Sequence, residues 1–96
     1  LRLIGTACEV ASPKGRPVGV CGEAAADPAL AAVLVGLGVA SLSMTARALP
    51  DVDAVLKSVS LTECQELARI ALDAATAEDA RSAVRAKLPI LEELGL

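Results

Sequence analysis

The sequence contains no histidine and no aromatic residue, and it has only three cysteines. Without histidine, this chain alone cannot build a His-dependent metal site or a Ser-His or Cys-His catalytic dyad. An odd number of cysteines without paired spacing indicates neither a disulfide framework nor a zinc site, so we expect a reduced, cytoplasmic setting. Because Phe, Tyr and Trp are missing, a core must come from Leu, Val, Ile and twenty alanines, which gives a small isolated domain marginal stability.

Positive charge is also scarce. The net charge is −3, and the basic residues stand in scattered pairs such as Lys14 and Arg16. Nucleic-acid binding needs a concentrated positive surface, so we expect no nucleic-acid partner. Residues 1–46 carry six charged side chains and residues 47–96 carry fifteen. This asymmetry predicts a buried first half and solvated helices in the second half.

Two short runs in the first half have the character of strands. Residues 17–21 and 39–44 are of strand length and lack polar alternation, which is typical of strands covered on both faces in a parallel sheet. A helix is expected over residues 1–12, before Pro13 and Gly15 end it. Its apolar stripe is formed by Leu3, Ala7, Val10 and Ala11.

A second helix is expected between the two runs. Asp27-Pro28 is a strong start signal, because Asp accepts hydrogen bonds from free N–H groups and Pro suits the first turn. Gly36 and Gly38 provide its end, and its apolar stripe consists of Leu30, Val33, Leu34 and Leu37. The order helix, strand, helix, strand predicts an α/β fold with parallel strands and crossover helices.

A membrane hairpin competes with this interpretation over residues 28–46. These 19 residues carry no charge and are long enough to cross a bilayer. Glycines, serines and a threonine interrupt the stretch, and Gly36-Leu37-Gly38 marks a change from helix to strand, so we expect no membrane partner. No basic region precedes a cleavable apolar segment, so no signal peptide is expected either.

The second half predicts only helices. After Pro50, an apolar stripe repeats at helical spacing, and Ser60 with Glu63 forms a capping box for the next helix. Thr76 caps a further helix, and Pro89 breaks or restarts the last turns. The three expected stripes are Val52, Val55, Leu56 and Val59; Leu61, Cys64, Leu67, Ala68, Ala71, Leu72 and Ala75; and Ala80, Val84 and Leu88.

The three cysteines differ in their surroundings. Cys8 and Cys64 lie on apolar helical stripes, where a free cysteine behaves as a small hydrophobic residue. Cys21 lies between two glycines at the carboxyl end of an expected strand, the edge of a parallel sheet where reactive groups gather. A core cysteine remains the alternative. If Cys21 is functional, the absence of histidine and the nearby anionic Glu23 favour a proton donor over a nucleophilic thiolate.

An ordered set of motifs resembles a known family. Val18-Gly19-Val20-Cys21-Gly22-Glu23, Asp27-Pro28, Gly36-Leu37-Gly38-Val39 and Leu42-Ser43-Met44-Thr45, with Pro50 beyond, are similar to the C-terminal end of Enzyme I. Enzyme I is the phosphoenolpyruvate (PEP)–protein phosphotransferase of the bacterial sugar transport system. The resemblance runs from about residue 1 to residue 75, and the sister families pyruvate phosphate dikinase and PEP synthase share its Cys-Gly-Glu signature.

The resemblance implies the C-terminal segment of a (β/α)₈ barrel, with residues 1–59 forming its last βα units and residues 60–96 a helical extension. It implies PEP and Mg²⁺ binding, phosphoryl transfer to a histidine on a separate N-terminal domain and then to the carrier HPr, and dimerisation. Cys21 would protonate the enolate of pyruvate, supported by Gly22 and Glu23. The phospho-accepting histidine, the family's arginines and the Mg²⁺ ligands are absent from these residues.

Some positions depart from the family pattern. Residues that are usual in the family are replaced at Ala24, Ala26 and Thr45-Ala46. The resemblance therefore does not specify the detailed geometry of the loops at these positions. Ser43-Met44 favours Enzyme I over its sisters. The alternative from another class is a non-catalytic helical oligomerisation module with Cys21 in its core. Because two strands of a barrel have open edges, we also expect self-association if residues 1–96 are made alone.

Overall fold

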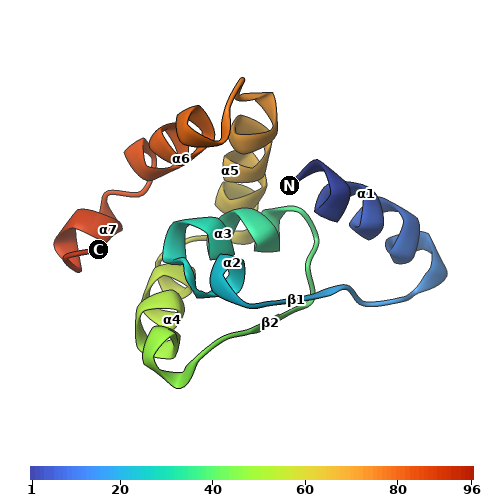
Figure 1. The fold of residues 1–96 in the computed structure, drawn as a ribbon, viewed down its shortest axis with the longest axis horizontal. Helices are drawn as coiled ribbons and strands as arrows, with labels where there is room; N and C mark the ends of the chain where they lie inside the picture. The colour runs from blue at the N-terminus through green and yellow to red at the C-terminus, as the bar shows by residue number, and fades with distance from the viewer.

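The first half of the chain folds as helix, strand, helix and strand, and the second half is helical (Figure 1). A computed structural model describes residues 1–96. The predicted order helix, strand, helix, strand and then helices is confirmed, with one additional short helix after the first strand and two 3₁₀ turns. The elements are α1 (Arg2–Ala11), β1 (Gly19–Cys21), α2 (Glu23–Ala26), α3 (Pro28–Gly36), β2 (Ser41–Ser43), α4 (Leu49–Ser58), α5 (Leu61–Asp73), α6 (Ala77–Ala86) and α7 (Ile90–Glu93), with 3₁₀ turns at Ser12–Lys14 and Ala46–Ala48.

The two strands pair in parallel, as predicted. Their register places Gly19 beside Ser41, Val20 beside Leu42 and Cys21 beside Ser43. Each strand is only three residues long, shorter than the predicted ranges 17–21 and 39–44. Pro17 has no N–H to donate, and the N–H of Val39 donates instead to the carbonyl of Leu34 at the end of α3 (3.1 Å).

One face of this sheet is exposed. Val20 and Leu42 are half-buried against a small core that contains Cys8, Leu34 and Val39. The alternate residues, Gly19, Cys21, Ser41 and Ser43, are all exposed. The expectation of strands covered on both faces is therefore wrong for this chain, because its helices pack against one face only. The exposed face consists of small residues, which is the feature that shapes the candidate site.

Helix α3 lies at the centre of the fold. Its start is confirmed: the Asp27 carboxylate accepts hydrogen bonds from the N–H groups of Ala29 (3.0 Å) and Leu30 (3.2 Å). The helix is buried almost all round, with Ala31, Ala32 and Leu34 fully buried. The predicted single stripe is too narrow, because α2, α4, α5 and α6 all contact α3. Gly36 ends the helix where its backbone meets α5.

Helix α1 presents a different face to the core from the one predicted. Leu3 is 86% exposed and Val10 is 55% exposed, so the expected stripe faces away from the core. Cys8 is buried and Ile4 is half-buried, and both pack near Leu37. The face of α1 that carries Ile4 and Cys8 packs inward because it fits the junction of α3 and β2. Nothing in this chain covers the opposite face of α1.

The C-terminal helices begin at the predicted caps. Ser60 and Glu63 form the capping box, and the Thr76 hydroxyl accepts from the N–H of Asp79 (3.0 Å). Leu61 and Ala75, at the two ends of the predicted α5 stripe, are exposed, because Leu61 lies in the first turn and Ala75 lies beyond the helix. A single core joins residues on both sides of position 60. Its members are Ala29, Ala32, Val33, Val55, Cys64, Leu67, Ala68, Ala71, Ala80, Val84, Leu88 and Leu91.

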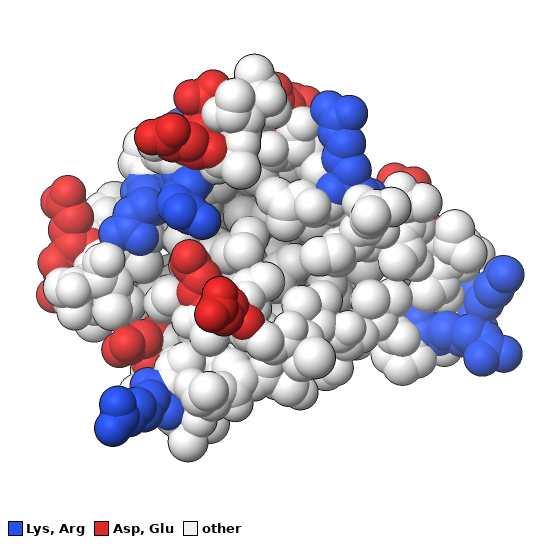
Figure 2. Space-filling model, in the orientation of Figure 1, with Lys and Arg blue, Asp and Glu red and all other residues white.

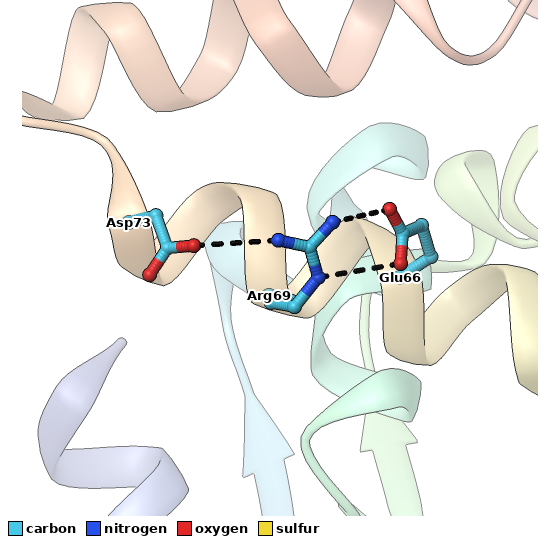
Figure 3. Close-up of polar contacts among 3 residues, drawn as sticks. All are labelled: Glu66, Arg69 and Asp73. Carbon is cyan, nitrogen blue, oxygen red and sulfur yellow. Dashed lines mark hydrogen bonds and ion pairs between the residues drawn. The ribbon is translucent and has the colours of Figure 1, made fainter.

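The solvent face of α5 carries an ion-pair ladder (Figure 3). Arg69 lies between Glu66 and Asp73, and its Nη1 is 3.5 Å from the Asp73 carboxylate. Hydrogen bonding and charge attraction from Arg69 lower the pKa of Glu66. All three side chains are more than half exposed, so the ladder contributes little to stability.

The uncharged stretch 28–46 divides between α3, the loop that follows it and β2. Helix α3 contains nine residues, and none of the helices has both the length and the apolar character that a bilayer crossing requires.

Candidate functional site

Cys21 lies at the carboxyl end of β1, as predicted, with an exposed free thiol. The alternative in which Cys21 is a core residue is wrong, because its side chain is on the uncovered face of the sheet. By contrast, Cys8 and Cys64 are core residues as predicted, at 6% and 2% exposure. The structure therefore separates one accessible cysteine from two buried ones.

Gly22 turns the chain sharply after Cys21. Its backbone angles, φ 97° and ψ −156°, lie in a region that residues with a Cβ rarely adopt. Nothing lies within 4 Å of where its Cβ would be, so conformation and not space requires glycine. The Gly22 N–H donates to the carbonyl of Ser43 (3.2 Å), which ties the turn to the end of β2.

Glu23 is the first residue of the short helix α2 and is exposed. The structure therefore places Glu23 in a helix and not in a loop. An acid in a first turn is favoured by the positive end of the helix. Behind it, Ala25 is fully buried, so α2 fills the space between β1 and α3. Strand, turn and helix thus follow each other within a few residues and fix the position of the thiol.

Two serines lie beside this segment, and the sequence motifs alone do not point to them. The parallel register places Ser43 beside Cys21 and Ser41 beside Gly19, all on the exposed face. A Cβ at Gly19 would lie 2.7 Å from the Ser41 hydroxyl oxygen, so glycine allows this close approach. The alternation Ser41-Leu42-Ser43 in a predicted strand was the available signal, because it places both hydroxyls on one face.

The surroundings of the thiol carry little charge. Figure 2 shows a broad uncharged surface where β1 and β2 lie in Figure 1, with charged side chains around its margins. Residues 17–22 and 36–46, which contain the strands, include no ionisable group other than the thiol. These residues therefore offer a free thiol and two hydroxyls, but no cation to hold a phosphate.

No group of three or more His, Cys, Asp or Glu residues is close enough to hold a metal ion. The residues present therefore do not fit a Mg²⁺ site by themselves. A largely apolar cavity of about 170 Å³ lies elsewhere, between α3, α5 and α6, and Cys21 does not line it. A substrate pocket over Cys21 would need walls that these residues do not supply.

Comparisons with known proteins agree with the resemblance. Residues 1–61 match the family model described as PEP-utilising enzyme, PEP-binding domain. The chain is 51% identical over 88 residues to the phosphoenolpyruvate-protein phosphotransferase of Streptomyces coelicolor, covering 92% of this chain and 16% of the relative. It is 45% identical over 82 residues to the multiphosphoryl transfer protein of Xanthomonas campestris pv. campestris, covering 85% of this chain and 10% of the relative.

A further relative, named phosphoenolpyruvate-dependent phosphotransferase system, comes from Salmonella typhimurium and is 36% identical over 86 residues, covering 90% of this chain and 12% of the relative. The chain thus spans between 10% and 16% of the length of these curated relatives. Because the family model matches residues 1–61, more than half of the chain, and these residues include both strands, the Cys21 turn and helices α1 to α4, the chain belongs to the PEP-utilising enzymes.

Proposed function

We propose that this chain is the C-terminal part of the PEP-binding domain of a PEP–protein phosphotransferase, in which Cys21 protonates the pyruvate enolate. The observation that carries the proposal is an exposed thiol at the carboxyl end of a parallel strand, inside the region that matches the family model. The names of the relatives, phosphotransferase and multiphosphoryl transfer protein, support the reaction class.

The chemistry assigns one step to this chain. When the phosphoryl group of PEP moves to an enzyme histidine, the enolate of pyruvate remains. The S–H bond of Cys21 breaks, a C–H bond forms at the methylene carbon of the enolate, and a thiolate is left on the enzyme.

The proposed setting is an eight-stranded barrel of which β1 and β2 are the last two strands. Helices cover one face of this pair and leave the other face uncovered, as in a strand pair of a barrel with outer helices. In a barrel, Cys21 would lie at the carboxyl-terminal rim, where the active sites of such barrels are found. Residues 1–59 would be the last βα units and residues 60–96 a helical extension, a division supported by the end of the family match at residue 61.

In this proposal, the phospho-accepting histidine and the Mg²⁺ ligands lie in parts of the protein outside residues 1–96. The chain has no histidine to accept the phosphoryl group and no set of residues that fits Mg²⁺. When bound, Mg²⁺ would neutralise phosphate charge. The same proposal includes phosphoryl transfer onward to HPr. It also includes a homodimeric enzyme and a cytoplasmic location, which keeps the thiol reduced.

The test uses the intact protein that contains residues 1–96. Incubation with ³²P-labelled PEP is expected to place an acid-labile phosphoryl group on the protein and to release one pyruvate for each group transferred. A Cys21→Ser variant is expected to lose turnover by at least about 10²-fold, because an alcohol is a poor proton donor. Absence of labelling contradicts the proposed reaction, whereas labelling with normal turnover of the Cys21→Ser variant contradicts only the role of Cys21.

A further inference from the structure

Ser43 is the direct cross-strand neighbour of Cys21. The two residues are register partners in the parallel pair, and neighbouring strands lie about 4.8 Å apart. Both side chains are exposed on the same face, while Val20 and Leu42 occupy the opposite face. The hydrogen bond from the Gly22 N–H to the Ser43 carbonyl (3.2 Å) pins the pairing at this point. The hydroxyl and the thiol are therefore held as neighbours by backbone structure.

We propose that the Ser43 hydroxyl donates a hydrogen bond to the Cys21 sulfur as the thiol gives up its proton. This inference rests on the proposed function of Cys21 and assigns Ser43 as a positioning residue that acts through the sulfur. A serine hydroxyl is short and rotates freely, so its O–H can turn toward a neighbouring atom on which negative charge develops. After transfer, the thiolate regains a proton from solvent water, and the hydroxide formed leaves to bulk solvent.

The local composition leaves few other donors for this role. Residues 17–22 and 36–46, which contain the strands, include no Lys, Arg or His, so no cation within them can stabilise the sulfur anion. Ser41 is the other hydroxyl of β2 on this face, but its register partner is Gly19, one pleat away from Cys21. Ser41 therefore provides a matched control: the same residue type, strand and face, without the thiol as neighbour.

The kinetic test compares Ser43→Ala, Ser43→Thr and Ser41→Ala in the intact protein. Loss of one hydrogen bond to a charged atom is expected to lower kcat of Ser43→Ala by about ten- to hundredfold, with KM for PEP unchanged within about twofold. The basic limb of its kcat–pH profile is expected to move to higher pH, because the thiolate is less stabilised. Ser43→Thr, which keeps a hydroxyl, and Ser41→Ala are expected to behave like the parent protein.

A second measurement needs no activity. The rate of Cys21 alkylation by iodoacetamide, followed by peptide mass spectrometry as a function of pH, reports the thiolate directly. In Ser43→Ala the half-maximal pH is expected to rise by about one unit, and in Ser41→Ala it is expected to stay unchanged. The pair Ser43→Thr and Ser43→Val has similar shape and differs in the hydroxyl, so it separates hydrogen bonding from packing.

The outcomes distinguish this inference from the proposed function. Full turnover of a Cys21→Ala variant would remove the role of Cys21 as acid, whereas a shifted alkylation profile in Ser43→Ala would still show that the hydroxyl stabilises the thiolate. An unchanged alkylation profile in Ser43→Ala overturns the inference. It is also overturned if Ser41→Ala shifts the profile equally, or if Ser43→Thr and Ser43→Val give the same profile.

Discussion

Replacing Gly36 by alanine tests whether the contact between α3 and α5 organises this fold. A Cβ on Gly36 would lie 2.0 Å from the carbonyl oxygen of Cys64 and 2.8 Å from the backbone nitrogen of Gln65. Real Cβ atoms do not come closer than 3.0 Å to such atoms, so the two helices must separate by about 1 Å. The obstructing atoms belong to the backbone, and no side-chain rotation can relieve the clash.

The expected cost follows from two opposing terms. Overpacking that displaces backbone costs about 1–3 kcal/mol, and the upper part of this range applies here. Replacing glycine by alanine within a helix stabilises the folded state by at most about 1 kcal/mol, through the entropy of the unfolded chain and helix propensity. This stabilisation is smaller at a helix end. The free energy of unfolding is therefore expected to fall by about 2 kcal/mol, and Tm by about 8–16 °C.

Circular dichroism at 222 nm during thermal and urea unfolding of residues 1–96 measures this loss. Gly5→Ala is the matched control, because Gly5 lies within α1 and its Cβ would meet only the Leu37 Cδ2 at 3.6 Å, an ordinary contact. The free energy of unfolding of Gly5→Ala is expected to rise by about 0.5–1 kcal/mol. Equal stability of Gly36→Ala and the parent chain, or equal destabilisation by both substitutions, would refute the described packing of α3 on α5.

Four further predictions concern the turn, the α3 cap, a buried thiol and the uncovered surfaces. Gly22→Ala is expected to cost about 1–3 kcal/mol through backbone strain alone and to lower turnover by displacing Cys21; unchanged stability by urea titration would contradict it. Asp27→Ala is expected to cost about 1 kcal/mol, because two α3 N–H groups lose their acceptor, while Asp27→Asn keeps most of the stability. Burial, with a smaller effect of Glu63, raises the pKa of Cys64, so the folded state holds this proton more tightly than the unfolded state. Stability is then fully present below the ordinary thiol pKa of 9.0 and falls as the pH rises above it. Urea midpoints at pH 8 to about 10.5 are expected to fall more steeply for the parent chain than for Cys64→Ala, and parallel slopes would contradict this. Residues 1–96 alone are expected to self-associate through the open strand edges and exposed residues such as Leu3, whereas a monomer by light scattering would show otherwise.

Local signals in the sequence predicted much of the secondary structure. Asp27-Pro28, the Ser60–Glu63 capping box and Thr76 act within a single turn, so their hydrogen bonds follow from neighbouring residues alone. The parallel pairing of the strands also followed from the order of elements. The accessible position of Cys21 was one of two alternatives that the sequence left open, and the structure decided between them.

Features that depend on distant residues could not be predicted. On α1, the stripe through Leu3 and the face through Ile4 and Cys8 are both compatible with helical spacing, and only the shape of the α3–β2 junction selects the second. The pairing of Ser43 with Cys21 depends on strand register, which sequence spacing does not specify. At Gly36 the sequence predicts only a helix end, because the close contact of this residue with α5 depends on packing between helices.

Replacement of Cys21 by alanine tests the central claim most directly. In the intact protein, PEP affinity by isothermal titration calorimetry is predicted to stay within about threefold of the parent value, because the thiol acts on the enolate and not on the phosphate. Turnover is predicted to fall by about 10²- to 10⁴-fold, the range that a positioned general acid contributes. A Cys8→Ala control removes a buried thiol and is predicted to keep its turnover at a temperature where the fold is intact. Normal turnover of Cys21→Ala would contradict the assignment of Cys21 as the proton donor.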